Sequence, residues 1–268
     1  MSTGTAVTIT IPPVNPVINQ NYDILDDLTA ALPDGQPREV CIGLHWTAVV
    51  MQVENQKRCG LAATLQGEHD HKQPDVPLAG SLDSLDSARL ADLSRSDSPT
   101  LVSVGMAAIN ALLPRQPDRW VEQNAEHLIA EHGAGKPVAL VGHFPFVGRL
   151  RDRVGELNVL ELNPGPGDLP VSEARRVVPE ARVVALTGMS LLNRTLEGLL
   201  SLCAPDALVI LLGPSVPLHD CLFDRGVDVL CGSVVTEIDK VLSAVRQGAN
   251  FRQVHRAGVR LVTMTGKG

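Results

Sequence analysis

The second half of the chain alternates short, continuous apolar runs with amphipathic stretches. Continuous apolar runs bounded by Gly, Pro or Asn are typical of strands that are buried on both faces of a parallel sheet. The stretches between them carry apolar residues three and four apart, which predicts helices. This alternation predicts a Rossmann-like parallel-sheet domain over residues 118–268. Its predicted strands are residues 137–142, 157–162, 181–187, 207–212 and 227–231. Its predicted helices are residues 146–154, 191–203 and 217–225 and a last helix that ends at Val245.

The first half of the chain shows a different order, with strands followed by helices. The first of two segments joined by a polar turn is rich in strand-forming residues and the second is mostly apolar, which predicts a pair of antiparallel strands. Helical spacing predicts helices before and after them, the strongest of which begins at Ser98 and Pro99. The predicted strands are residues 39–53 and 58–65, and the predicted helices are 21–32, 82–93, 100–113 and, leading into the second half, 118–132. We therefore expect an α+β domain over residues 1–117, and an α/β protein of two domains overall.

Small and polar residues follow the predicted parallel strands, at the edge where such sheets bind ligands. Glycine lets the backbone approach a ligand closely, and the polar side chains can form hydrogen bonds with it. We expect a ligand site around the turn 142–148, which Asn110 of the first half reaches across the junction. The candidate ligand-binding residues are Gly142, Phe144, Pro145, Glu161, Asn163, Thr187, Gly188, Asn193, Thr195, Gly213, Pro214, Ser215 and Asn110.

The turn 142–148 lacks the glycine spacing that a dinucleotide needs. Its glycines stand only at its two ends, around a bulky Phe-Pro-Phe centre. A pyrophosphate cradle needs glycines where the backbone meets the phosphates, so a purely structural turn is an equal alternative. Glu161 follows Gly142 at about the distance where an acid meets ribose hydroxyls in Rossmann sites. His143 lies in the ligand-facing turn and is the candidate catalytic acid or base, or a metal ligand.

One segment of the first half concentrates potential metal ligands, in the order Glu68, His69, Asp70 and His71. Two imidazoles at positions i and i+2 of an extended loop can share one ion, and carboxylates can complete the coordination. His69 and His71 are therefore the candidate metal ligands. The alternative is a solvated polar loop, since no second cluster with the same logic occurs in the chain.

The amino-acid composition limits which binding partners and which cellular compartment we expect. The net charge is −7, from 23 basic and 30 acidic residues, and no basic stripe is present, so we expect no nucleic-acid partner. No apolar run approaches the length of a membrane span, and we expect no membrane partner. Five irregularly spaced cysteines without a secretion signal predict reduced thiols and a cytoplasmic protein. A homodimer is expected on general grounds.

Several segments together resemble a heavy-metal-chelation family of unknown function. The segments are 141–146, 161–164, 186–195 and 212–218 in the second half, with 60–64 and 105–111 in the first. The resemblance covers nearly the whole chain, from about Asn21 to Gly248. It implies an enolase-N-terminal-like first domain, a Rossmann-like second domain and a site in the cleft between them. It also implies a role in handling or making small metal-chelating molecules.

Three functional hypotheses follow, and the sequence alone does not choose between them. The first is a protein of heavy-metal homeostasis that binds a nucleotide-, pterin- or metallophore-like small molecule in an interdomain cleft, with or without catalysis. The second is a non-catalytic binder of a divalent metal or a metal chelate, through His69 and His71. The third is a transferase with a nucleoside cofactor such as S-adenosylmethionine, which rests on fold analogy and Glu161.

Overall fold

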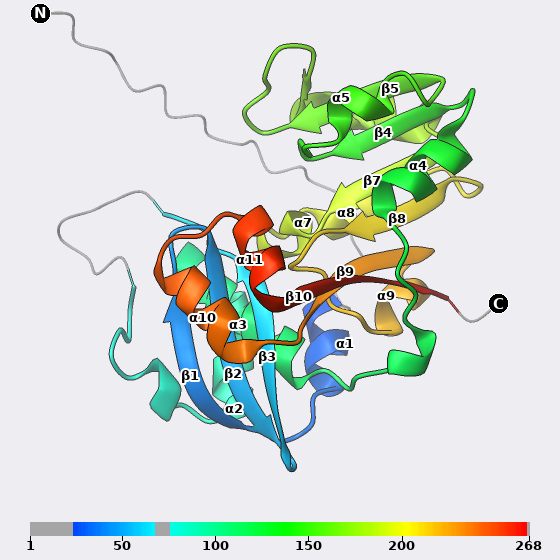
Figure 1. The fold of residues 1–268 in the computed structure, drawn as a ribbon. Helices are drawn as coiled ribbons and strands as arrows, with labels where there is room; N and C mark the ends of the chain where they lie inside the picture. The colour runs from blue at the N-terminus through cyan, green and yellow to red at the C-terminus, as the bar shows by residue number, and fades with distance from the viewer. Residues whose placement is uncertain (1–23, 68–75, 267–268) are drawn as a thin grey trace, which may run out of the picture.

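The protein contains a small antiparallel sheet and a larger, mostly parallel sheet, each flanked by helices (Figure 1). The structure is a computed structural model and describes residues 24–67 and 76–266. The two sheets confirm the predicted α/β fold class, whereas the domain boundary at residues 117 and 118 stays a prediction. None of the helices in these two described ranges is both long and apolar enough to cross a membrane.

The small sheet is a three-stranded meander in the order β1-β2-β3. Its strands are β1 (Gln36–Ile42), β2 (Trp46–Val53) and β3 (Gln56–Ala63). The segment 39–53, predicted as one strand with a kink near Gly43, forms two strands, because the chain reverses at Gly43, whose N–H donates to the Trp46 carbonyl at 2.9 Å. A Cβ at Gly43 would lie 2.3 Å from the Val245 carbonyl oxygen, so only glycine fits this turn.

Helices cover both faces of the small sheet. On one face α3 (Pro99–Leu112) crosses β2 and β3, and it begins after Ser98 with Pro99 in its first turn, as predicted, although the Ser98 side chain makes no capping hydrogen bond. The other face is covered by α10 (Ile238–Arg246) and α11 (Phe251–Gly258), which come from the far end of the chain (Figure 1). Beside α3 lies α2 (Ser87–Asp92), and α1 (Ile24–Ala30) packs against α2.

The large sheet has seven strands in the order β10-β9-β8-β7-β4-β5-β6. The strands are β4 (Pro137–Val141), β5 (Glu156–Glu161), β6 (Leu169–Pro170), β7 (Val183–Thr187), β8 (Leu208–Leu212), β9 (Val229–Val235) and β10 (Val259–Thr265). The five predicted strands are present. The sheet is mostly parallel, as predicted, and β10, a strand that the sequence did not predict, pairs antiparallel with β9 and closes one edge.

The helices of this sheet are shorter than predicted. They are α4 (Ala125–Gly133), α5 (Val147–Leu150), α6 (Ala174–Val177), α7 (Met189–Leu192), α8 (Leu196–Leu200) and α9 (Cys221–Asp224). Single 3-10 turns occur in both halves of the chain, at Leu82–Ser84, Leu93–Arg95, Pro117–Arg119, Val171–Glu173 and Val178–Glu180. The helix predicted over 118–132 begins only at Ala125, because Val121 pairs with Thr263 of β10 instead. The helix predicted over 191–203 is broken at Arg194, whose φ is +58°.

Alternate residues along the strands of the large sheet point to two different cores. Leu140 of β4 packs with α4 and α5 on one face. Ala139 and Val141 of the same strand pack on the other face, in a core that also includes Met106 and Ile109 of α3. This second core is continuous with one face of the small sheet, so the two halves of the chain are packed against one another.

Candidate functional site

The candidate site lies at the carboxyl edge of the large sheet, where the strand order reverses. β5 lies on one side of β4 and β7 on the other, which makes this pair of junctions the topological switch point. Gly142 ends β4 with φ +101°, and a Cβ there would lie 3.0 Å from the Cβ of Thr187 at the end of β7. The two predicted residues are therefore neighbours, and the backbone at this point requires glycine.

A groove of about 610 Å³ opens beside this switch point. It passes over the end of β8 and the middle of β9, between α4 and the loop after β4 on one side and α11 with β10 on the other. Three phenylalanine rings line it, those of Phe144, Phe146 and Phe251, together with the imidazole of His255 and with Pro145 and Pro214. The rings of Phe144 and Phe146 are stacked, with centroids 5.2 Å apart and planes 12° apart. A groove of this volume and lining is typical of sites for small organic molecules.

The acidic and arginine side chains of the groove are matched in pairs. Glu126, only 6% exposed, accepts hydrogen bonds from Arg149, with Nη2 2.6 Å from Oε2. That hydrogen bond lowers the pKa of the Glu126 carboxyl, although burial acts in the opposite direction. Glu122 and Arg260 form a second pair, with Oε1 and Nη2 2.6 Å apart. These four side chains carry no net charge, so the groove suits a neutral or weakly charged ligand better than a polyanion.

His143 belongs to a polar network on the other side of the β4 turn. Its Nδ1 lies 2.8 Å from Oδ2 of Asp168, whose side chain is 2% exposed, while the imidazole itself is half exposed. Asp168 also accepts a hydrogen bond from the Gly165 N–H at 3.2 Å. The buried carboxylate thus fixes the orientation of the imidazole. His143 does not line the groove, and its predicted role as an acid, a base or a metal ligand stays a prediction.

Glu161 joins this network through backbone hydrogen bonds. Its Oε1 accepts from the His143 N–H at 2.9 Å and its Oε2 from the Leu162 N–H at 2.8 Å. The carboxylate therefore ties the loop after β5 to the loop after β4. Asn163 follows in the same loop and is exposed. A contact of Glu161 with a ribose stays a prediction.

Asn110 and Ser215 connect the two halves of the chain. Asn110 Nδ2 donates to the Leu61 carbonyl at 2.9 Å and to the Ser215 carbonyl at 3.1 Å. Ser215 Oγ accepts from the Ala63 N–H at 2.9 Å, and the Gly188 N–H donates to the Leu212 carbonyl at 2.8 Å. These polar groups hold α3 and β3 against the loops after β7 and β8. None of the predicted residues Asn110, Gly188 and Ser215 lines the groove.

Asn193 and Thr195 lie in the turn between α7 and α8. Asn193 Oδ1 accepts hydrogen bonds from the Thr195 hydroxyl at 2.6 Å and from the Thr195 N–H at 3.2 Å. These polar groups therefore already have partners within the turn. Neither residue lines the groove. Of the predicted ligand-binding residues, those that do line it are Phe144, Pro145, Gly213 and Pro214.

Sequence reasoning missed two walls of the groove. One is the segment 122–126, which was placed inside a helix, and the other is formed by α11 and β10, which lie beyond the last predicted helix. A signal for β10 was available, since the run 259–265 (VRLVTMT) is rich in β-branched and apolar residues. No local signal indicated that it would meet residues 122–126.

The cysteines are poorly suited to hold a metal. Burial raises the pKa of all five thiols, to about 12 for Cys59 and Cys221 and to about 11 for Cys203. Metals bind the thiolate, so a metal ion would have to displace a proton from each of these buried thiols. Within residues 24–67 and 76–266, no three His, Cys, Asp or Glu side chains gather in an arrangement that could hold a metal ion. The predicted ligands His69 and His71 lie outside the described residues.

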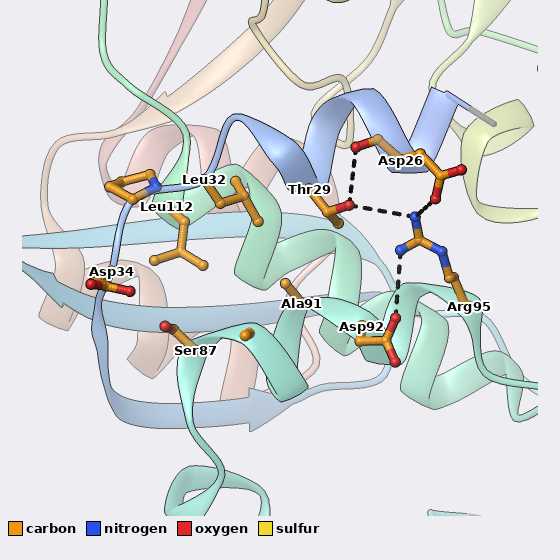
Figure 2. Close-up of a pocket in the computed structure, with 11 residues that line it drawn as sticks. Asp26, Thr29, Leu32, Asp34, Ser87, Ala91, Asp92, Arg95 and Leu112 are labelled. Atoms are coloured by element: carbon orange, nitrogen blue, oxygen red, sulfur yellow. Dashed lines mark hydrogen bonds and ion pairs between the residues drawn. The ribbon is translucent and has the colours of Figure 1, made fainter. Parts of the chain in front are cut away.

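A second cavity, of about 400 Å³, lies between α1, α2 and the end of α3 (Figure 2). Arg95 reaches Asp26 at 2.5 Å and Asp92 at 3.6 Å across its mouth. Both aspartates are largely exposed, at 63% and 73%, so these are solvated surface ion pairs of small energetic value. The larger groove, with its buried carboxylate and aromatic walls, is the stronger candidate site.

Comparisons with known proteins agree with this two-part organisation. The DUF364 family model matches residues 124–264 and the DUF4213 model matches residues 25–113, and both are described as "Putative heavy-metal chelation". Among curated proteins, "Uncharacterized protein MJ0500" of Methanocaldococcus jannaschii is 26% identical over 210 residues, which cover 74% of this chain and 78% of the relative.

Solved structures of the same family are similar over most of the chain. A DUF364 protein from Desulfitobacterium hafniense superposes with a TM-score of 0.79 at 26% identity, over 90% of this chain and 97% of its own. A DUF364 protein from Pyrococcus horikoshii gives a TM-score of 0.74 at 20% identity, over 90% and 98%. Both are described as proteins of unknown function. From the two matched regions and the shared fold, the chain belongs to the DUF364 family, whose members are associated with heavy-metal chelation.

Proposed function

We propose that the protein binds a planar organic metal chelator, free or as its metal complex, in the groove between α4, α11 and β10. The observation that carries the proposal is the groove itself, which brings three phenylalanine rings together at the carboxyl edge of the sheet. All of its lining residues lie between Glu122 and Val262, so the ligand would sit beside the junction of the two halves and not across it. The family description fits a protein whose ligand carries the metal.

Aromatic walls favour a flat ligand with its own ring system. Offset or edge-to-face contacts between rings add about 0.5–1.5 kcal/mol each beyond the burial of apolar area. Phe144 and Phe146 present stacked rings on one wall, and Phe251 lies on the other. A planar chelator could use these faces while its metal-binding edge stays in water.

Direct coordination of a heavy metal by this part of the chain is disfavoured by its side chains. The described cysteines are buried thiols with raised pKa values. A soft metal ion would have to displace a proton from each of them and break the packing around it. Binding the chelator as an organic molecule avoids both costs.

Nucleotide ligands fit the groove less well. The β4 turn holds Phe144, Pro145 and Phe146 where a phosphate cradle needs glycine, and α5 is a single turn. Arg149 and Arg260 each already pair with a carboxylate. The S-adenosylmethionine hypothesis and the dinucleotide hypothesis therefore gain no support from the side chains of the groove.

The proposal is tested with 8-hydroxyquinoline, a two-ring planar chelator, alone and with Zn²⁺, by isothermal titration calorimetry. We expect the chelator or its zinc complex to bind the protein, and NAD and Zn²⁺ alone to bind weakly or not at all. Binding of Zn²⁺ alone with an affinity equal to that of the complex, and its loss in cysteine-to-serine variants, would instead identify the protein as a direct metal binder.

A further inference from the structure

One edge of the groove is an incompletely paired strand. β10 is the outermost strand of the large sheet, and Thr263 exchanges two hydrogen bonds with Val121, at 2.8 and 3.0 Å. The N–H and C=O of Thr263 therefore point away from β9. In an antiparallel ladder this direction alternates along the strand, so the N–H and C=O of Leu261, two residues earlier, also point away from β9.

Neighbouring positions on this outer edge have partners. The Val259 N–H donates to the His255 carbonyl, and the Thr265 carbonyl accepts from Arg119 at 2.9 Å. Within the described residues, neither the N–H nor the C=O of Leu261 makes a hydrogen bond. Leu261 is 43% exposed and lines the groove. Its backbone therefore offers one donor and one acceptor, side by side, at the wall of the groove.

The gap at Leu261 has a local cause. After Val121 the chain would continue along β10, but Asn124 caps α4 by accepting a hydrogen bond from the Glu126 N–H at 2.9 Å. The backbone ladder with β10 therefore ends at the single Val121–Thr263 bridge: the Gln123 N–H donates to the Val121 carbonyl at 3.1 Å, and the Gln123 carbonyl accepts from the Thr263 hydroxyl at 3.0 Å instead of from a backbone N–H. Glu122, the residue after the bridge, forms an ion pair with Arg260, the residue before Leu261. The capping of one helix thus leaves the edge of the strand open toward the groove.

We infer that the Leu261 backbone is the polar recognition element of this groove, and that it binds a planar heterocycle with an adjacent hydrogen-bond donor and acceptor on one edge. A cyclic amide has this pattern. Its C=O would accept from the Leu261 N–H and its N–H would donate to the Leu261 C=O, as a neighbouring strand would. The ring would then lie among the phenylalanine side chains. This inference rests on the proposed function and specifies the chemical class of its ligand.

Two matched compounds test the inference on the unmodified chain. Quinolin-2(1H)-one carries the cyclic amide, and its N-methyl derivative has the same rings without the N–H. We expect the N-methyl compound to bind about fivefold more weakly, the effect of one net hydrogen bond. Selective ¹⁵N-leucine labelling follows the Leu261 amide by NMR, which should shift and become protected from hydrogen exchange only with the first compound.

A pair of variants tests the same point from the protein side. Leu261→Pro removes the N–H, and proline is tolerated on an edge strand where the N–H faces outward. Leu261→Ala shortens the side chain but keeps the N–H. Leu261→Pro keeps the C=O that accepts from the ligand N–H and loses only the hydrogen bond to the ligand carbonyl, so we expect quinolin-2(1H)-one to bind about fivefold more weakly to Leu261→Pro than to Leu261→Ala.

Three results would overturn the inference. The first is equal affinity of the two compounds for the wild-type chain, and the second is failure of both to bind at millimolar concentration. The third is a Leu261 amide already protected from exchange without ligand, because a second copy or another segment would then cover the edge. The first two results leave the 8-hydroxyquinoline measurement unaffected, so they do not by themselves disprove the proposed function.

Discussion

Glu126 is a buried carboxylate that lines the groove and holds the neighbouring arginine side chains in place. Its carboxylate is almost fully buried, yet it pairs with two guanidinium groups, those of Arg149 at 2.6 Å and Arg153 at 3.4 Å. A buried carboxylate is stable only when it is paired and hydrogen-bonded, so α4 and α5 are held together by charge at this point. The carboxylate also neutralises the charge of Arg149, the one of the two arginines that lines the groove, and a phosphate ligand would need that charge.

This arrangement makes stability dependent on pH. The folded-state pKa of Glu126 lies below its ordinary value of about 4.5, so its stabilising effect is fully present above that value and is lost as the pH falls through the lowered pKa. Glu126→Gln should reduce the free energy of unfolding by about 1–2 kcal/mol at pH 7 and by progressively less below pH 4.5.

Chemical denaturation from pH 7 to pH 3 measures this effect, with Glu122→Gln as the control. Glu122 pairs with Arg260 but is 68% exposed, so we expect little change in that variant. A constant difference between the wild-type chain and Glu126→Gln over the whole pH range would contradict the assignment.

At the scale of elements, glycines set how closely α3 approaches its neighbours. A Cβ at Gly105 would lie 1.9 Å from the Ser94 backbone nitrogen, and one at Gly60 of β3 would lie 2.1 Å from the Ala107 carbonyl oxygen of α3. Both contacts are with backbone, which cannot move aside as a flexible side chain can. The small residues of α3 therefore allow close packing between the helix and its surroundings.

Two glycine-to-alanine substitutions test this packing. Gly105→Ala should destabilise the protein by about 1–3 kcal/mol, the usual cost of overpacking. Gly148→Ala in α5 is the matched control, since a Cβ there meets nothing within 4 Å. That variant should be neutral or more stable by up to about 1 kcal/mol, because alanine favours helix. Equal effects in thermal unfolding would show that close approach is not what Gly105 provides.

The elements that sequence periodicity predicted are those whose residues are determined locally. Apolar runs identified β4, β5, β7, β8 and β9, since both faces of these strands are buried. The start of α4 was misplaced because the pairing of Val121 with Thr263, 142 residues later, has no local signal. The break at Arg194 depends on a left-handed backbone conformation, and an arginine in the sequence does not predict that conformation.

The candidate site was predictable only in part, for the same reason. The carboxyl edge and the residues Phe144, Pro145, Gly213 and Pro214 follow from parallel-sheet topology. The opposite wall, from Phe251 to Val262, comes from an antiparallel strand and a helix at the end of the chain. Asp168 was missed because it meets His143 only through the folding of a loop 25 residues away.

At the scale of the whole molecule, the groove lies where three separate parts of the chain meet. The segment before α4, the loop after β4 and the final α11–β10 unit each form one wall, while the shared core below keeps the two sheets in place. We propose that this groove, and not the polar edge around His143, holds the ligand.

Two tryptophan substitutions test that claim most directly. Leu261 and Leu162 are each 43% exposed, but only Leu261 lines the groove, whereas Leu162 follows Glu161 at the polar edge. Affinity for 8-hydroxyquinoline with Zn²⁺ is measured by calorimetry on both variants, after thermal unfolding shows that both fold. We predict that Leu261→Trp fills the groove and lowers the affinity at least tenfold, roughly 1.4 kcal/mol, while Leu162→Trp leaves it unchanged. Unchanged affinity in Leu261→Trp together with a loss in Leu162→Trp would contradict the account and move the ligand to the edge around His143.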